Sequence, residues 1–162
     1  MNDMSRRGKG IALSLAAPLA LAAALGCGGD QGPADPVDFQ PIALAPCGRD
    51  PGDGLSPDQR SLSAMLAALH SRGYPLHQVS PTEMTIYTQY RDVRGIPVAW
   101  QARFQSDGSG ELMVAETMPP QDGRTAGQLR EWGRAVVATF NQLKCLPRDK
   151  LRAQCEKAGF SF

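Results

Sequence analysis

Ile96–Gln105 is the stretch that most constrains the fold, because its apolar side chains recur at every second position. The apolar set comprises Ile96, Val98, Trp100, Ala102 and Phe104, and the polar set comprises Gln101, Arg103 and Gln105. Successive side chains of a strand point to opposite faces, so this pattern predicts a strand with one buried and one solvated face. Such a strand is typical of an antiparallel sheet that is covered on one side only.

Other segments extend this strand into a sheet. Strand-like patterns also occur at Tyr74–Val79, Glu83–Tyr90 and Glu111–Met118. Tyr74–Val79 is expected at the edge, because Pro75 has no N–H to donate to a neighbouring strand. Ser106–Gly110 predicts a Gly-rich hairpin loop, and Asp92-Val93-Arg94-Gly95 predicts a turn. The sheet is therefore predicted as an antiparallel meander of three to four strands.

Helical periodicity occurs on both sides of these strands. A helix is predicted over Pro57–Arg72, with one buried stripe made of Leu62, Met65, Leu66 and Leu69. Ser56 and Gln59 have the spacing of a capping box, and Gly73 can end this helix. A second helix is predicted over Thr125–Lys144, with an apolar face made of Leu129, Trp132, Val136, Phe140 and Leu143.

A short helix over Arg148–Ala158, after Pro147, completes the predicted fold. The order of elements is α-β-β-β-β-α followed by this short C-terminal helix. Each long helix has one apolar face to bury, and the sheet has one apolar face to receive it. The chain is thus predicted to be an α+β protein with both long helices packed on one face of an antiparallel sheet.

The N-terminal segment has the pattern of a secretory signal. Arg6, Arg7 and Lys9 precede the apolar run Ile11–Leu25, and small residues follow it. A transmembrane helix needs roughly 20 apolar residues, and this run is shorter and contains Pro18. A cleaved signal is therefore favoured over a permanent span.

The end of that signal, Ala24-Leu25-Gly26-Cys27, resembles the lipobox of bacterial lipoprotein precursors, although Ala24 stands where the usual pattern has Leu. The resemblance covers only residues 1–29. It implies cleavage before Cys27 and attachment of lipid to the sulfur and the amine of that residue. Several acyl chains anchor a protein stably where one does not. Gly28, rather than Asp, follows the cysteine, which by the same resemblance favours the outer over the inner membrane of a bacterial envelope. An ordinary secretory signal with an incidental Cys27 is the alternative.

Three segments follow from this pattern: a signal peptide over 1–26, a lipidated tether rich in Gly, Pro and Asp over 27–54, and one domain over 55–162. The second half of the tether is expected to dock on the domain, because it contains Phe39, Ile42 and Leu44; a partner-binding strand is the alternative, disfavoured by Pro41. Removal of the signal takes three of 17 basic and one of 16 acidic residues, which leaves a net charge of −1. This balance argues against nucleic acid as a partner.

Three cysteines, Cys47, Cys145 and Cys155, remain after Cys27. The oxidising envelope favours a disulfide, and three thiols always leave one unpaired. The apolar face of the second helix turns Cys145 toward a neighbouring segment rather than the main core. This placement favours a pair between Cys47 and Cys145, with Cys145 and Cys155 as the alternative.

Residues that could support catalysis or metal binding are scattered. His70 and His77 have no Cys or carboxylate at metal-ligand spacing, and Ser109 lies between two strands rather than in a nucleophile elbow. Asp50-Pro-Gly-Asp53-Gly54 lacks the remaining ligands of a calcium loop, so a solvated linker is expected. Glu116 falls on the inward side of its strand and could act as a general acid or base, but no second carboxylate pairs with it. No enzyme activity, cofactor or metal is predicted.

The sheet face that the helices leave open is the candidate binding surface. It is expected to carry Thr85, Tyr87, Gln89, Gln101, Arg103, Met113 and Thr117. Tyr, Arg and Met are enriched at protein interfaces, although a plain solvated face is also common. We therefore predict a non-catalytic envelope lipoprotein, anchored to the membrane through lipid on Cys27, that contacts an envelope protein. The alternative is binding of a small ligand or an envelope polymer on the same face.

Overall fold

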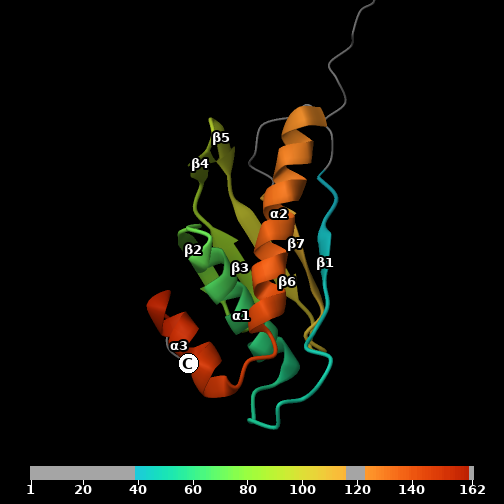
Figure 1. The fold of residues 1–162 in the computed structure, drawn as a ribbon, viewed down its shortest axis with the longest axis vertical. Coiled ribbons are helices and arrows are strands. Elements are labelled where there is room, and N and C mark those ends of the chain that lie inside the picture. The colour runs from blue at the N-terminus through green and yellow to red at the C-terminus, as the bar shows by residue number, and fades with distance from the viewer. Residues whose placement is uncertain (1–38, 116–122, 161–162) are drawn as a thin grey trace, which may run out of the picture. The chain divides into compact units, whose positions relative to one another are not determined.

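The computed structural model describes residues 39–115 and 123–160. Within them the elements, in chain order, are β1 (Ile42–Leu44), α1 (Pro57–Ser71), β2 (Leu76–Ser80), β3 (Thr85–Thr88), β4 (Arg91–Val93), β5 (Ile96–Val98), β6 (Trp100–Phe104), β7 (Gly110–Val114), α2 (Gly123–Leu143) and α3 (Arg148–Lys157). Figure 1 shows α2 lying across the sheet and α3 beside the end of α1. The α+β class and the antiparallel sheet predicted from the sequence are confirmed.

The main sheet has five strands in the order β1-β7-β6-β3-β2, and every pairing is antiparallel. The predicted count of three to four strands is therefore too low. The additional strand is β1, which comes from the segment predicted as tether and pairs Ile42 with Leu112 and Leu44 with Gly110. Pro41 immediately precedes β1 and does not interrupt it, because the missing N–H falls outside the paired residues of an edge strand. Docking of this segment thus takes the form of strand addition.

The segment Ile96–Gln105 is not one strand, as predicted, but two. β5 pairs with β4 in a separate hairpin, whereas β6 pairs with β3 and β7 in the main sheet. The pattern of burial nevertheless continues across the break at Ala99, since Val98 and Trp100 are both fully buried. The predicted turn over 92–95 is shorter than expected, because only Arg94 and Gly95 have positive φ, 56° and 81°. Two such residues form the tight turn that joins hairpin strands.

Both long helices pack on the same face of the sheet, the face that carries Trp100 and Phe104. The Phe104 ring stacks on Phe140 of α2, with centroids 6.1 Å apart. At Gly133, α2 lies close to the sheet: a Cβ there would lie 2.6 Å from Ile42 Cδ1 and 3.2 Å from the Trp100 ring. The absence of a side chain at Gly133 therefore lets the helix backbone approach the sheet directly.

Helix α1 is the central element rather than a helix with one buried stripe. All residues from Arg60 to Leu69 are buried, because α1 contacts the sheet, α2 and α3. The buried hydroxyl of Ser61 is satisfied by donating to the carbonyl oxygen of Gly108, 2.7 Å away in the β6–β7 turn. The predicted capping box is present, with the Ser56 N–H donating to Gln59 Oε1 at 3.3 Å. The helix ends at Ser71, one residue before the predicted Arg72, and Gly73 has the left-handed φ, 74°, that was predicted for it.

Candidate functional site on the open face of the sheet

The register of β3, β6 and β7 gathers side chains on the sheet face that the helices leave open. Tyr87, Gln101 and Met113 lie opposite one another in a row across the three strands. Arg103 lies in the next row, between Thr85 and Glu111. Each of these residues alternates with a core residue, so the buried positions of the strands also determine which side chains face outward.

This face forms a hollow of about 810 Å³, a size typical of small-molecule sites. We call it the open-face hollow. Its lining consists of His77, Tyr87, Thr88, Gln89, Tyr90, Ala99, Gln101, Arg103, Met113 and Ala115. Five of the seven residues expected on this face therefore line the hollow. Of the other two, Thr85 is buried, with 3% of its surface exposed, and Thr117 lies outside the described residues.

The centre of the open-face hollow is held by hydrogen bonds. Gln101 donates through Nε2 to the Tyr87 hydroxyl at 2.8 Å, and only 8% of Gln101 is exposed. The floor includes Ala99 and Ala115, whose backbones are joined by an N–H···O bond of 3.0 Å. A fixed polar pair beside a floor of small side chains gives this surface a preformed shape.

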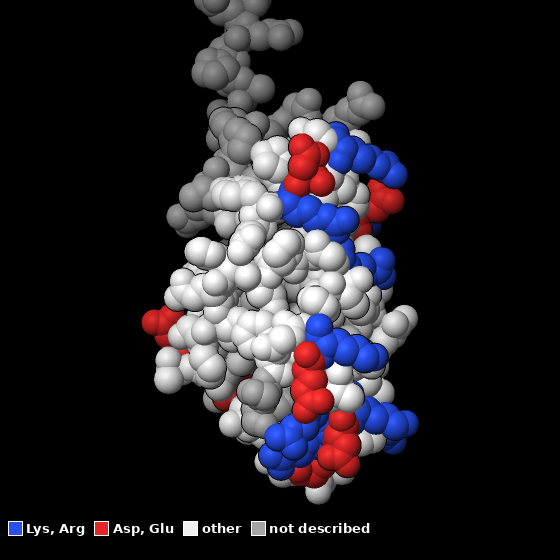
Figure 2. Space-filling model, turned by 90° about the vertical axis from the view of Figure 1, so that its left-hand side faces the viewer, with Lys and Arg blue, Asp and Glu red and all other residues white. Residues whose placement is uncertain are grey.

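The rim of the open-face hollow carries side chains that remain available to a ligand. Tyr90 is the exposed large hydrophobic residue of the described chain, with 48% of its surface accessible. The side chains of His77 and Gln89 make no hydrogen bond to the residues that the structure describes. Arg103 is exposed and is the only Lys, Arg, Asp or Glu among the described residues that line the hollow. Figure 2 shows from the β2 side that the middle of this surface has no charged side chains, whereas charges lie at its upper and lower ends and along its margins.

Five lining residues were not predicted at this site: His77, Thr88, Tyr90, Ala99 and Ala115. The alternation of Glu83–Tyr90 assigns Tyr90 to the inward face, but β3 ends at Thr88 and the chain then bends toward β4. His77 lies at an irregularity of β2, between the pairs formed by Leu76 and Gln78. A bend or bulge changes the face to which a side chain points without any change in local composition. Strand periodicity alone therefore does not predict which side chains are redirected.

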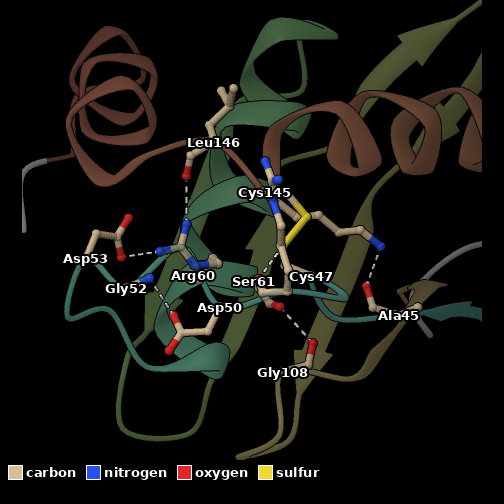
Figure 3. Close-up of a disulfide and its surroundings, with 12 residues drawn as sticks. Ala45, Cys47, Asp50, Gly52, Asp53, Arg60, Ser61, Gly108, Cys145 and Leu146 are labelled. Carbon is tan, nitrogen blue, oxygen red and sulfur yellow. Dashed lines mark hydrogen bonds and ion pairs between the residues drawn. A yellow bond between two sulfur atoms is a disulfide. The ribbon is translucent and has the colours of Figure 1, made fainter.

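A second cluster of polar residues and sulfur lies where the segment after β1 meets the ends of α2 and α1 (Figure 3). Cys47 and Cys145 form a disulfide, as the sequence favoured. Beside it, Lys144 donates through Nζ to the Ala45 carbonyl oxygen at 2.7 Å. Cys155 remains a thiol, is fully buried and donates through Sγ to the Ser63 carbonyl oxygen at 3.2 Å.

Asp53 belongs to this cluster rather than to the solvated linker that was predicted. Its carboxylate forms an ion pair with the buried Arg60 and accepts a hydrogen bond from the backbone N–H of Arg148 at 2.7 Å. Arg60 in turn donates to the Leu146 carbonyl oxygen at 2.7 Å. The Arg60 hydrogen bond is the main reason that the pKa of Asp53 lies below its ordinary value. The cluster ties three chain segments together, which indicates a structural role.

The remaining candidates for chemistry are separated in space or lie outside the described residues. His70 is exposed at the end of α1, and Ser109 donates through its hydroxyl to Asp107 at 2.6 Å in the β6–β7 turn. This bond lowers the pKa of Asp107. Glu116, proposed as an inward carboxylate, and the signal with Cys27 fall outside the described ranges. In those ranges no three His, Cys, Asp or Glu side chains are grouped to hold a metal ion.

The sequence matches no protein-family model, and comparisons with curated proteins and with solved structures find no match. None of the helices within residues 39–115 and 123–160 has the length and apolar character needed to cross a membrane.

Proposed function

We propose that this chain is a lipid-anchored, non-catalytic binding protein of the bacterial envelope, and that the open-face hollow is its binding surface. The observation that carries the proposal is the hollow itself: a concave face with a fixed floor, an exposed tyrosine and unpaired polar side chains on its rim. Concave sites with a few convergent polar groups are the usual places where proteins bind ligands.

The anchoring part of the proposal rests on the N-terminal sequence. Lipid on Cys27 would hold the chain at the membrane, and residues 28–41 would separate the lipid from β1 by at most about 50 Å if fully extended. Metabolic labelling with a fatty acid should label the wild-type chain and leave the Cys27→Ser variant unlabelled. Label on the variant, or none on the wild type, would contradict lipid anchoring at Cys27.

The non-catalytic part rests on the lining of the open-face hollow. Among the described residues, this lining contains one histidine, His77, and no Asp or Glu. General acid–base chemistry ordinarily needs a titratable group with a positioned partner, which this lining does not supply.

Two classes of occupant fit the open-face hollow. Tyr87, Tyr90, Met113 and Arg103 are of the types enriched at protein interfaces, which supports an envelope protein. The concavity and volume of the hollow support a small ligand or an envelope polymer. Both use the same surface, so a single set of variants tests the binding face before its occupant is known.

The test is co-sedimentation of the unlipidated Cys27→Ser chain with isolated cell envelopes. We expect the chain to bind envelopes saturably, and we expect the double substitution Tyr90→Ala with Arg103→Gln to abolish most of this binding. Arg130→Gln is the matched control, because Arg130 is exposed on α2, away from the open-face hollow. Equal binding by all three proteins, or no binding by any, would contradict the proposed function.

A further inference from the structure

We infer that the open-face hollow binds a glycan chain that bears carboxylate groups, with Arg103 receiving a carboxylate and Tyr90 stacking on a sugar ring. The inference rests on the proposed function, because it names the occupant of the same surface. Three properties of the hollow support it: the polar side chains suit sugar hydroxyls, the shape suits a sugar ring, and the charge of Arg103 suits a carboxylate.

The polar groups of the hollow suit a ligand rich in hydroxyls. Gln89 and His77 each present both donor and acceptor capacity without a partner among the described residues. The Tyr87 hydroxyl accepts from Gln101 and keeps its own hydrogen to donate. A sugar hydroxyl is likewise donor and acceptor at once, so it can pair with neutral amides, imidazole and phenol in either sense. A ligand that carries only charged groups of one sign could not satisfy both the donors and the acceptors among these side chains.

The shape of the hollow suits flat rings. Ala99, between β5 and β6, and Ala115, directly after β7, have small side chains on the floor, so a ring can approach the sheet closely. Tyr90 is about half exposed at the rim, and its ring face carries negative partial charge. The C–H groups on one side of a pyranose carry small positive partial charges and complement that face. The hollow therefore offers stacking as well as hydrogen bonding.

The charge of the hollow suits a carboxylate. Arg103 forms no ion pair with any described residue, although Glu111 is its neighbour on β7. A guanidinium can bind a carboxylate through two parallel N–H···O bonds. Because the described lining offers no second Lys or Arg, one anionic group per few sugar units fits better than a dense array of charge.

A protein partner fits less well on the same evidence. Binding energy at protein interfaces is concentrated where large side chains enter deep, desolvated pockets. Of the lining residues, Met113 and the two floor alanines are the aliphatic members, and they form a floor rather than a pocket. A protein occupant is therefore kept as an outcome of the test rather than as the proposal.

The experiment is calorimetric titration of the full chain in a detergent without sugar headgroups. The probes are oligosaccharides of galacturonic acid, oligosaccharides of alternating glucuronic acid and N-acetylglucosamine, and the carboxyl-reduced form of each. We expect at least one acidic oligosaccharide to bind, and its reduced form to bind about tenfold more weakly, the usual loss for one charge-assisted hydrogen bond. Arg103→Gln should produce the same tenfold loss for the acidic form and leave the reduced form unchanged. Tyr90→Ala should weaken both forms.

Failure of the inference and failure of the proposed function give different results. If no oligosaccharide binds while envelopes still retain the Cys27→Ser chain through this face, the glycan inference is overturned and the proposed function stands. Tighter binding of a polyglutamate peptide than of every oligosaccharide, abolished by Arg103→Gln, would assign the face to proteins and also overturn the inference. Loss of both envelope and oligosaccharide binding would overturn both. Arg130→Gln again serves as the matched control.

Discussion

Removal of the disulfide between Cys47 and Cys145 should cost this protein most of its conformational stability. The bond closes a loop with a sequence separation of 98 residues, and it joins the segment after the edge strand β1 to the chain that follows α2. In the chain-entropy model, a cross-link across about 100 residues stabilises the folded state by about 4–5 kcal/mol, because it restricts the unfolded chain. Domains of this size usually have only about 5–15 kcal/mol in total. We therefore expect the double substitution Cys47→Ala with Cys145→Ala to leave a marginally stable fold.

Urea unfolding followed by tryptophan fluorescence measures this loss, because Trp100 is fully buried in the folded state. Reduction of the wild-type protein with dithiothreitol is the internal control: it should lower the free energy of unfolding by the same amount and leave the double variant unchanged. The buried thiol of Cys155 is common to both proteins and cancels in the comparison. A loss below about 1 kcal/mol in both cases would refute the reasoning, since it is far under the loop-closure value.

Three further results are expected. Gly108→Ala should lower the free energy of unfolding by more than the about 1–2 kcal/mol that a left-handed residue costs, because a Cβ there would also lie 2.7 Å from a backbone oxygen. Gly95 has a similar φ and open space around it, so Gly95→Ala should cost only about 1–2 kcal/mol. The urea midpoints of the two variants measure this difference. The pKa of Asp53 lies below its ordinary 3.8, so its carboxylate stabilises the fold above pH 3.8 and loses that contribution as the pH falls through the lowered pKa. In the Asp53→Asn variant the free energy of unfolding should therefore fall less steeply below about pH 4 than in the wild type. An equally steep fall in both proteins would contradict this. Burial raises the pKa of the Cys155 thiol to about 12, so iodoacetamide at pH 8 should alkylate it only after unfolding, as mass spectrometry can verify.

The helices could be predicted from the sequence because their signals are local. The capping residues Ser56 and Gln59 and the terminating Gly73 act within one turn, and the bounds of α1 differ from the prediction by one residue. The burial of α1 on nearly all sides could not be predicted, since it depends on α3 packing against it from the far end of the chain. Local periodicity reports what a helix can bury, whereas tertiary contacts decide how much it does bury.

The sheet was predicted less completely because strand partners are set at long range. β1 has the composition of a linker and becomes a strand only because β7 offers an unpaired edge. β5 and β6 are continuous in the sequence pattern but pair with different strands. For the candidate site, alternation placed Tyr87 and Gln101 correctly on the open face. It misplaced Tyr90, because the chain leaves the strand before that residue.

Photo-crosslinking in living cells tests most directly whether the open-face hollow binds a partner. A photoactivatable amino acid would replace Tyr87 or Met113 in the hollow, or exposed Arg130 on α2 as the control. Arg103 is left in place, because the proposed binding needs its guanidinium. We expect a distinct crosslinked species, resolved by mass spectrometry of the membrane fraction, from the two hollow positions and not from position 130. Equal, diffuse capture from all three positions would mean that the open face is only solvated surface, and would contradict binding at the hollow.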